Sequence, residues 1–338
     1  MKVNFVVDYP KIRDNGITTA ALRLAERLES KGIDVSINGK GYNYDILHSH
    51  ATSPKYIFKI KKAKRLGLKT VIHAHTTAED IRGSFILTKN DFTLDIIGKY
   101  LTYFYNNADI VITPSNWSKS TLIKRGVNVP IKVLSNGIDL KEFNFDERKS
   151  RAFKDKYGID YDDILVYTIG IVFIRKGIET FKKVAEELKH LKFLWAGKRY
   201  KPLFIDYTSV NKILKNLPPN LNFLGRIDNE DLVGIHCAGD IFLFPSFAEN
   251  QAIATLEARA CSKAIVLRNL PVYDWAIHKE NCLIAQNDEE FIRYVNILSK
   301  DKNLRYKIGR AAKKVAKKND INITIKELIK NYEDLLSS

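Results

Sequence analysis

The sequence predicts an α/β protein with two doubly wound halves, and three observations lead to this expectation. Short β-branched runs alternate with stretches of helical spacing, as in a parallel sheet that helices cover on both faces. The alternation is interrupted by a polar, charged segment at residues 141–163 and then starts again. The chain has 338 residues, of which 45% are hydrophobic, and this is enough for two domains of ordinary size.

The first half begins with an apolar strand at residues 3–7 and a helix at residues 18–31. The apolar residues of this helix recur every three or four positions, and Gly32 ends it. The same alternation continues through strands at 45–48, 69–73, 109–113 and 131–134, and helices at 55–66, 94–106 and 118–125.

The second half repeats the pattern. Its expected strands are 164–168, 192–196, 222–224, 240–244 and 264–267, and its expected helices are 177–188, 231–237 and 251–261, before a helical tail from residue 289. Ligands of such sheets bind at the carboxyl ends of the strands. Two halves joined near residue 141 and facing each other would place the site in the cleft between them.

The chain is strongly basic. Lys and Arg number 55 against 39 Asp and Glu, so the net charge is +16. This charge bears on partners rather than on fold, and it is compatible with phosphorylated substrates, nucleic acid or an anionic membrane surface. The excess is concentrated between residues 55 and 69, which contain seven basic residues and no acidic one.

The cysteines and the apolar runs bear on the cellular compartment. The three cysteines have no metal-ligand spacing, and their odd number excludes complete pairing, so we expect free thiols in a reducing compartment. The first residues contain too short an apolar run for a signal peptide, and no stretch approaches the roughly 18 apolar residues of a spanning helix. We therefore expect a cytoplasmic protein whose contact with a membrane is peripheral.

A first candidate binding site follows the expected strand at residues 240–244. Glu249 lies in the loop at the carboxyl end of this strand, and Glu257 lies further along the next helix, placed to accept a hydrogen bond from a ribose hydroxyl. The free N–H groups at the start of that helix form an anion site; they belong to Asn250, Gln251, Ala252 and Ile253. The alternative is structural, with Glu249 capping the helix and Glu257 on its surface.

A second candidate site joins the first strand of the second half to its first helix, at residues 170–177. Arg175 and Lys176 directly precede the expected helix start, where their charge and the helix dipole together suit a diphosphate. The alternative is a solvated basic loop. In the first half, Gly16 would let the backbone approach a phosphate, although a plain turn explains this glycine equally well.

Two His-x-His strings follow strands of the first half: His48-Ser49-His50 and His73-Ala74-His75. Residues two apart on a strand share a face, so each string could chelate a metal, and a metal-dependent hydrolase is the alternative class of enzyme. No third cluster of histidine and acidic residues follows, and Asp160-Tyr161-Asp162 fits a loop and helix start better than a metal site. We therefore expect no metal.

Together these residues resemble glycosyltransferase family 4, whose members are retaining enzymes of the GT-B fold, with two Rossmann-like domains facing across a cleft. The family signature is a glutamate, seven residues and a Glu-Ala pair, which matches Glu249 and Glu257-Ala258. The family's phosphate loop matches Gly170 to Lys176-Gly177, and its inter-domain Asn-Gly-Val-Asp motif resembles Asn136-Gly137-Ile138-Asp139. The resemblance covers nearly the whole chain.

The resemblance implies a role for each candidate residue. His75 and Glu249 are implied in catalysis, beside the reacting sugar. Residues implied in donor binding are Gly16, Arg175, Lys176, Asn250, Gln251, Ala252, Ile253 and Glu257. Residues 1–140 would form the acceptor-binding domain and residues 141–320 the nucleotide-sugar-binding domain, with a helix at 321–338 crossing back to the first. The chain departs from the family at Ile171, where arginine is usual, and at residues 250–252, which replace a glycine-rich stretch.

Within the family, Arg175-Lys176-Gly177 and the segment 268–275 are similar to the bacterial glucosyl-diacylglycerol synthases. This similarity implies transfer of glucose from UDP-glucose to diacylglycerol or a related membrane lipid, with retention of anomeric configuration and without a metal cofactor. Transfer to a soluble sugar, sugar phosphate or glycan is the alternative. A non-catalytic sugar-nucleotide-binding protein is a third hypothesis.

The expected helix at residues 55–66 bears on the acceptor. It interleaves apolar residues with cations, which is typical of an element that lies on an anionic membrane surface. Its cations are Lys55, Lys59, Lys61, Lys62, Lys64 and Arg65. A solvated amphipathic helix that covers the sheet is the alternative. We do not expect a nucleic-acid partner, because no recognition module accompanies the helix.

Overall fold

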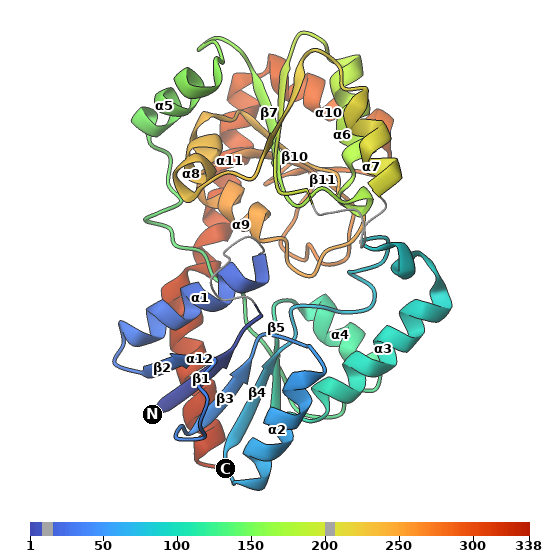
Figure 1. Ribbon diagram of the computed structural model, residues 1–338. Coiled ribbons are helices and arrows are strands. Elements are labelled where there is room, and N and C mark those ends of the chain that lie inside the picture. Colours follow the sequence, from blue (N-terminus) through green and yellow to red (C-terminus); the bar gives the residue numbers. More distant parts are fainter. Residues whose placement is uncertain (9–15, 200–206) are drawn as a thin grey trace. The chain divides into compact units, whose positions relative to one another are not determined.

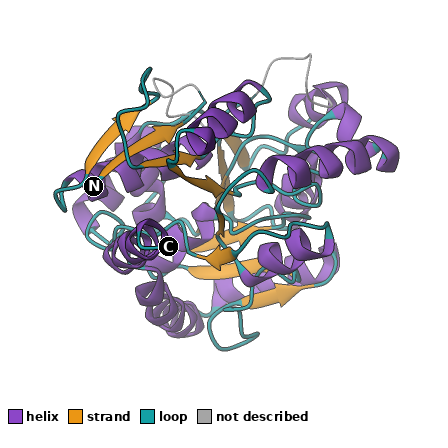
Figure 2. Ribbon diagram, turned by 90° about the horizontal axis from the view of Figure 1, so that it is seen from below, coloured by secondary structure: helices purple, strands orange, loops and turns teal. Residues whose placement is uncertain are grey.

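The structure is a computed structural model, and it describes residues 1–8, 16–199 and 207–338. The chain forms two compact units (Figure 1). Each unit contains one six-stranded sheet, in which every pairing of neighbouring strands is parallel. Helices lie on both sides of the strands (Figure 2). The predicted α/β class with two doubly wound halves is therefore confirmed.

The two units do not follow the order of the sequence strictly. Unit 1 consists of Met1–Ile81, Asn90–Gly137 and Ile321–Ser338, and unit 2 consists of Arg82–Lys89 and Ile138–Asp320. The C-terminal segment Ile321–Ser338 is thus grouped with the first unit. The short segment 82–89 joins the second unit, and no pattern in the sequence marks this exchange.

The sheet of unit 1 has the strand order β2-β1-β3-β4-β5-β6. Its strands are β1 (Lys2–Val6), β2 (Asp34–Ile37), β3 (Ile46–Ser49), β4 (Lys69–His73), β5 (Ile110–Thr113) and β6 (Ile131–Val133). The direction in which the sheet grows reverses between β1 and β3, and doubly wound sheets bind ligands at the carboxyl ends of the strands beside such a reversal. His48 and His50 lie at this end of β3.

Five helices cover the sheet of unit 1. They are α1 (Gly16–Glu29), α2 (Lys55–Arg65), α3 (Asp91–Tyr105), α4 (Asn116–Lys124) and α12 (Ile321–Leu336). Successive residues of a strand point to opposite faces: Ile46 packs with α1 and α12, whereas Leu47 packs with α2 and α3. Both faces are therefore buried, which explains the continuous apolar runs in these strands. In Figure 1, α12 lies beside α1.

The sheet of unit 2 has the strand order β12-β11-β10-β7-β8-β9. Its strands are β7 (Leu165–Ile169), β8 (Lys192–Ala196), β9 (Leu221–Gly225), β10 (Ile241–Phe244), β11 (Ala264–Arg268) and β12 (Leu283–Ala285). Read from β9 and renumbered with β7 as the first strand, this is the 3-2-1-4-5-6 order of Rossmann-like sheets. In that order the direction of sheet growth reverses between the first and fourth strands. In unit 2 these are β7 and β10, the strands that precede both candidate donor loops.

Helices again cover both faces of the sheet in unit 2. They are α5 (Glu147–Tyr157), α6 (Ile178–Glu187), α7 (Tyr207–Lys215), α8 (Asn229–Ala238), α9 (Ile253–Ala260), α10 (Asp288–Lys300) and α11 (Lys302–Ala316), with short 3-10 turns η1 (Ile86–Lys89), η2 (Ile174–Lys176) and η3 (Lys317–Asn319). Phe181 of α6 and Phe291 of α10 belong to one buried cluster, and Val233 of α8 and Leu256 of α9 belong to another.

Four elements lie outside the predicted pattern: β2, β12, α5 and α7. Strands β2 and β12 have four and three residues, too few for a periodic signal. Helix α5 lies within the segment that the sequence marks as polar and charged. Asp146 caps its start, and Phe153 anchors it against Gly234 of α8, where an added Cβ would lie 2.9 Å from the ring. Lys156 and Tyr157 also bond to Asp231 of α8. Most residues of α5 are charged, so the spacing of apolar residues did not predict this helix.

The start of α9 differs from the prediction. The helix expected at residues 251–261 begins at Ile253, because Ala252 has φ 61° and ψ 78°, in the left-handed region. A non-glycine residue seldom adopts this conformation, so the sequence offers no signal for it. The Ala252 carbonyl accepts hydrogen bonds from the Thr255 N–H at 2.9 Å and the Thr255 hydroxyl at 2.8 Å, which hold the turn in place.

Gly177 joins η2 to α6 and provides a test of this fold. Its φ is 77°, and a Cβ at this position would lie 2.3 Å from the Pro245 carbonyl oxygen. We expect Gly177→Ala to lower the free energy of unfolding by about 3 kcal/mol, through left-handed strain and steric conflict combined. Gly158→Ala is the matched control: its φ is 62°, but no neighbouring atom lies within 4 Å of the added Cβ, so about 1 kcal/mol is expected. Urea denaturation measures the free energy of unfolding of both variants. Equal losses would contradict the close packing of Gly177 against the Pro245 carbonyl.

Candidate functional site

Two loops meet at the reversal point of the unit 2 sheet. One loop follows β7 and ends in Arg175 and Lys176, and the other follows β10 and carries Glu249. The Lys176 ammonium donates a hydrogen bond to Glu249 Oε1 at 2.5 Å, and Arg175 Nη1 lies 3.8 Å from the same oxygen. The structure thus brings together the three charged side chains that the sequence placed in two separate candidate sites.

Backbone groups fix the two loops to each other. Arg175 Nη1 donates to the Ala248 carbonyl at 2.6 Å, and the Phe247 N–H donates to the Arg175 carbonyl at 2.7 Å. The Ser246 hydroxyl donates to Glu249 Oε1 at 2.6 Å. Since the cations are bonded to the neighbouring loop, the alternative of a freely solvated basic loop does not describe this structure.

Glu249 is ionised despite its burial. The residue is 7% exposed, and burial alone would raise the pKa of its carboxyl. The charges of Lys176 and Arg175 and the hydrogen bonds to the carboxylate outweigh this effect and hold the pKa of Glu249 below its ordinary value. The carboxylate is bonded to Lys176 and Ser246, so helix capping does not account for its position.

The start of α9 supplies backbone donors beside Glu249. The first N–H groups of a helix have no partner within the helix, and they carry the positive end of its dipole. Because α9 begins at Ile253 and Thr255 bonds back to Ala252, the amides of Ile253 and Ala254 are those at the helix start. This position is two residues later than the sequence predicted. Asn250 and Gln251 belong to the preceding loop.

Glu257 lies on the buried side of α9, at 4% exposure, and so it is not the surface residue of the structural alternative. Its Oε2 lies 3.5 Å from Nε2 of His236 on α8, and Nδ1 of His236 lies 2.8 Å from the Tyr167 hydroxyl. Burial lowers the pKa of His236, while the neighbouring Glu257 opposes this shift. The predicted contact of Glu257 with a ribose stays a prediction.

The other two candidate residues belong to unit 1. Gly16 is exposed and begins α1. His75 follows β4, and its Nε2 lies 2.9 Å from Nδ1 of His50. Burial lowers the pKa of His75 to about 3, so the ring is neutral near neutral pH. A neutral imidazole can exchange hydrogen bonds with a sugar without introducing a charge.

The structure also adds residues that the sequence analysis did not select. Arg175 Nε donates to the hydroxyl of Ser84, which reaches the loop from the exchanged segment 82–89. No sequence signal marks Ser84. Arg268, at the end of β11, stacks on Phe247 with its guanidinium carbon 3.8 Å from the ring centre and donates to the Pro245 carbonyl at 3.0 Å. The sequence signal that could have selected Arg268 is its place at the end of an expected strand, in the segment 268–275.

The six cations of α2 divide into two groups. Three are bonded to neighbouring groups of unit 1: Lys59 to the Gly39 carbonyl (2.6 Å), Lys61 to the Tyr103 hydroxyl (2.6 Å) and Lys64 to Asp109 (2.9 Å). The other three, Lys55, Lys62 and Arg65, are exposed. Of these, Lys55 Nζ lies 3.7 Å from Asp8 Oδ1, and Lys62 Nζ lies 4.9 Å from the centre of the Tyr42 ring.

Comparison with solved structures identifies the class of fold. Sucrose-phosphate synthase from Thermosynechococcus elongatus matches with a TM-score of 0.83 over 99% of both chains, at 15% identity. Anabaena HepE, in complex with UDP-glucose, matches with a TM-score of 0.80 over 99% of this chain and 100% of that chain, also at 15% identity. Two Rossmann-like units in this order define the GT-B fold, as predicted.

Sequence relatives then identify the family. Residues 38–142 match the profile of Glycosyltransferase Family 4, and residues 149–315 match that of Glycosyl transferases group 1. The processive diacylglycerol alpha-glucosyltransferase of Acholeplasma laidlawii is 31% identical over 286 residues, which cover 84% of this chain and 83% of the relative. The alpha-galactosylglucosyldiacylglycerol synthase of Streptococcus pneumoniae is 25% identical over 278 residues, 81% of this chain and 74% of the relative. The chain belongs to glycosyltransferase family 4 and is a nucleotide-sugar-dependent glycosyltransferase.

The buried pair gives a prediction for stability and pH. Glu249→Gln removes the carboxylate that Lys176 and Arg175 contact, and the side chains of these two cations are 14% and 15% exposed. We expect a loss of about 3 kcal/mol in the free energy of unfolding at pH 7. Because the folded-state pKa of Glu249 lies below the ordinary 4.5, the contribution is present above pH 4.5 and is lost as the pH falls through the folded-state pKa.

Denaturation of the wild type and Glu249→Gln at pH 7 and in acid measures this effect, and the difference between them should shrink in acid. Glu147→Gln is the control, because Glu147 forms an exposed pair with Arg151 at 3.0 Å and its loss should matter little at either pH. Equal stability of Glu249→Gln and the wild type at pH 7 would show that the pair is not a buried electrostatic link.

Proposed function

We propose that this glycosyltransferase moves glucose from UDP-glucose to diacylglycerol or a closely related membrane lipid, with retention of anomeric configuration. The observation that carries the proposal is the buried contact of Lys176 with Glu249 at the reversal point of unit 2. Two sequence relatives are named for products built on diacylglycerol, and one of these names specifies an alpha-glucosyl product. A structural relative is described in complex with UDP-glucose.

Donor binding follows from the charges at this site. A diphosphate carries more negative charge than one carboxylate and accepts charge-assisted hydrogen bonds from Lys176 and Arg175. In this proposal the phosphates replace Glu249 as the partner of Lys176, and the amides of Ile253 and Ala254 add donors. Glu249 then becomes free to accept hydrogen bonds from hydroxyls of the sugar. The Lys176–Glu249 pair thus holds both groups in place before the donor arrives.

The same groups assist the chemical step. As the bond between the anomeric carbon and the UDP oxygen breaks, negative charge develops on the diphosphate, and prearranged cations and amides stabilise it most where water is excluded. The acceptor hydroxyl attacks from the face that UDP leaves, forming the new carbon–oxygen bond. Its proton passes to a phosphate oxygen of the departing UDP, so charge and atoms balance.

An activity assay tests this proposal. Wild-type protein should consume UDP-glucose and form an α-glucosyl lipid in vesicles that contain diacylglycerol. Lys176→Ala should lower kcat/KM about 10²–10³-fold, the range for losing one prearranged donor to a developing charge. Lys189→Ala, which removes an exposed lysine of the same unit, should stay near the wild-type value.

The product of this assay separates the alternatives. Proton NMR of a β-linked product would contradict retention. Transfer to soluble sugars but not to lipid would contradict the lipid acceptor and support the alternative of a soluble acceptor. Binding of UDP-glucose with neither transfer nor hydrolysis, whether or not lipid is present, would support the non-catalytic hypothesis.

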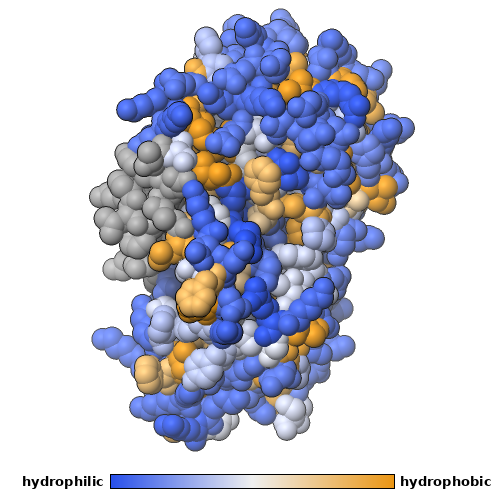
Figure 3. Space-filling view, turned by 90° about the vertical axis from the view of Figure 1, so that its right-hand side faces the viewer, coloured by the Kyte–Doolittle hydropathy of each residue, from blue (hydrophilic) through white to orange (hydrophobic). Residues whose placement is uncertain are grey.

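The outer surface of unit 1 supports a lipid acceptor. On α2, Phe58, Lys62 and Arg65 recur at helical spacing and are exposed, with Phe58 78% accessible. Leu66, which follows the helix, is exposed as well. On the same side of the sheet, α3 exposes Phe92, 75% accessible, among other apolar residues. Figure 3, which views unit 1 from the side of α3, shows apolar side chains set singly among hydrophilic ones. Apolar residues among cations suit the interface of an anionic bilayer.

Within the described residues, no helix has both the length and the apolar content that a bilayer span needs. The proposed contact is therefore electrostatic and superficial. Each cation near an anionic surface contributes about 1 kcal/mol to such binding. Lys62 and Arg65 are the cations that α2 presents together with Phe58, whereas Lys59 and Lys64 bond to unit 1 itself.

Vesicle sedimentation tests this membrane contact. The triple variant Phe58→Ser, Lys62→Glu, Arg65→Glu should bind phosphatidylglycerol vesicles at least tenfold more weakly than the wild type. The control variant Lys307→Glu, Arg310→Glu makes the same change in charge on exposed positions of α11, and it should bind nearly as well as the wild type. An equal loss in both variants would mean that only the overall charge matters and would contradict a membrane surface on α2.

A further inference from the structure

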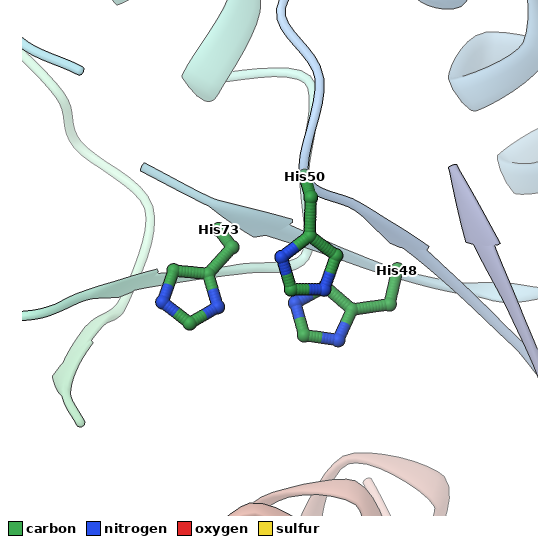
Figure 4. A group of neighbouring side chains, drawn as sticks. All are labelled: His48, His50 and His73. Atoms are coloured by element: carbon green, nitrogen blue, oxygen red, sulfur yellow. The ribbon is translucent and has the colours of Figure 1, made fainter. Parts of the chain in front are cut away.

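The two His-x-His strings of the sequence lie side by side in unit 1. Strands β3 and β4 are parallel neighbours, with Ser49 paired to Ile72, so both strings extend from the carboxyl end of the same sheet. One ring nitrogen from each of His48, His50 and His73 lies within 4.8 Å of the other two (Figure 4). All three rings are buried, with at most 2% exposure. The sequence analysis weighed each string as a separate chelator and did not join them.

Several nitrogens of these rings have no hydrogen-bond partner among the described residues. They are Nε2 of His48, Nε2 of His50, and both Nδ1 and Nε2 of His73. Buried polar atoms are almost always partnered, so four such atoms in one cluster require an explanation. Stacking accounts for the ring faces, since the centres of His48 and His50 lie 4.2 Å apart, but it leaves the nitrogens at the ring edges unsatisfied.

We propose that His48, His50 and His73 form a transition-metal site in unit 1, suited to Zn²⁺. Neutral imidazole nitrogens are ligands that zinc favours, whereas magnesium and calcium require oxygen. Tetrahedral Zn–N bonds of about 2.0–2.1 Å place the nitrogens roughly 3.4 Å apart, so binding would draw these rings together by about 1 Å. Such a shift is within the broad range of the terminal ring torsion of histidine.

The partners of the remaining nitrogens agree with this site. His48 Nδ1 lies 2.5 Å from the hydroxyl of Tyr332 on α12, and His50 Nδ1 lies 2.9 Å from Nε2 of His75. A metal-bound imidazole normally uses its other nitrogen in a hydrogen bond of this kind, which fixes the orientation of the ring. These contacts leave Nε2 of both His48 and His50 for the metal, and in each of these two rings Nε2 is the nitrogen that lacks a partner.

The position of the site defines its role. Its ligands come from β3, the residue after it, and the end of β4, and its outer contacts reach α12 and His75. An ion held there would tie the end of the sheet to the C-terminal helix and stabilise unit 1 by binding only its folded state. The three histidines supply three of the four ligands of a tetrahedral ion, and a water would take the fourth position. We assign the ion a structural role because all three rings are buried. It is therefore distinct from the hydrolytic metal weighed in the sequence analysis.

Metal analysis of the whole chain tests the proposal. Protein freed of metal with a chelator and then dialysed against Zn²⁺ should retain one ion per chain, measured by mass spectrometry. Its Tm should rise by roughly 5 °C at an excess of Zn²⁺ far above Kd. Co²⁺ in place of Zn²⁺ should give the visible absorption bands of a tetrahedral nitrogen site. A wild-type protein that neither retains an ion nor shows these bands would overturn the proposal.

A ligand variant and a matched control locate the ion. His73→Phe keeps an aromatic ring in the stack but removes both nitrogens, so it should lose the bound ion, the cobalt bands and the rise in Tm. His190→Ala removes an exposed histidine of unit 2 and should keep all three. If His73→Phe retains the ion and the same cobalt spectrum, the proposed site is wrong. If this variant fails to fold, the wild-type stoichiometry and cobalt spectrum decide alone.

Discussion

The proposed donor site depends on one constraint, the adjacency of the parallel strands β7 and β10. Their carboxyl ends release two loops at the same point, and only this adjacency places Lys176 within 2.5 Å of Glu249. Burying charges is costly unless each is paired and hydrogen-bonded. Here Ser246 and the second cation, Arg175, satisfy the carboxylate further. The proposed binding of the nucleotide thus rests on strand order, and the loops add only a few specific side chains.

The sequence was sufficient to predict the alternation of strands and helices, because parallel strands buried on both faces are apolar throughout and easy to recognise. It was insufficient wherever a few tertiary or backbone details decide the structure. Phe153 packs α5 against Gly234, and Tyr157 donates to Asp231 of α8. The left-handed Ala252 delays the start of α9. The exchange of residues 82–89 between units, which brings Ser84 to Arg175, depends on tertiary packing that no local pattern encodes.

The candidate residues likewise divide into features that the sequence predicts and contacts that only the structure shows. Motif spacing selected Lys176 and Glu249, but strand order was needed to show that they touch. Spacing also selected both histidine strings, yet the decisive fact is that β3 and β4 are neighbours, which turns two pairs into one stack of rings. On α2, periodicity identified the cations but could not assign partners: Lys59 turns to a backbone carbonyl, whereas Lys62 stays exposed.

The central claim is that a nucleotide diphosphate takes the place of Glu249 beside Lys176. A crystal structure of the protein with UDP tests this claim most directly. The account predicts phosphate oxygens within hydrogen-bond distance of the Lys176 ammonium and of the amides that begin α9, with the Lys176–Glu249 bond broken. A nucleotide bound elsewhere, with that bond intact, would contradict it.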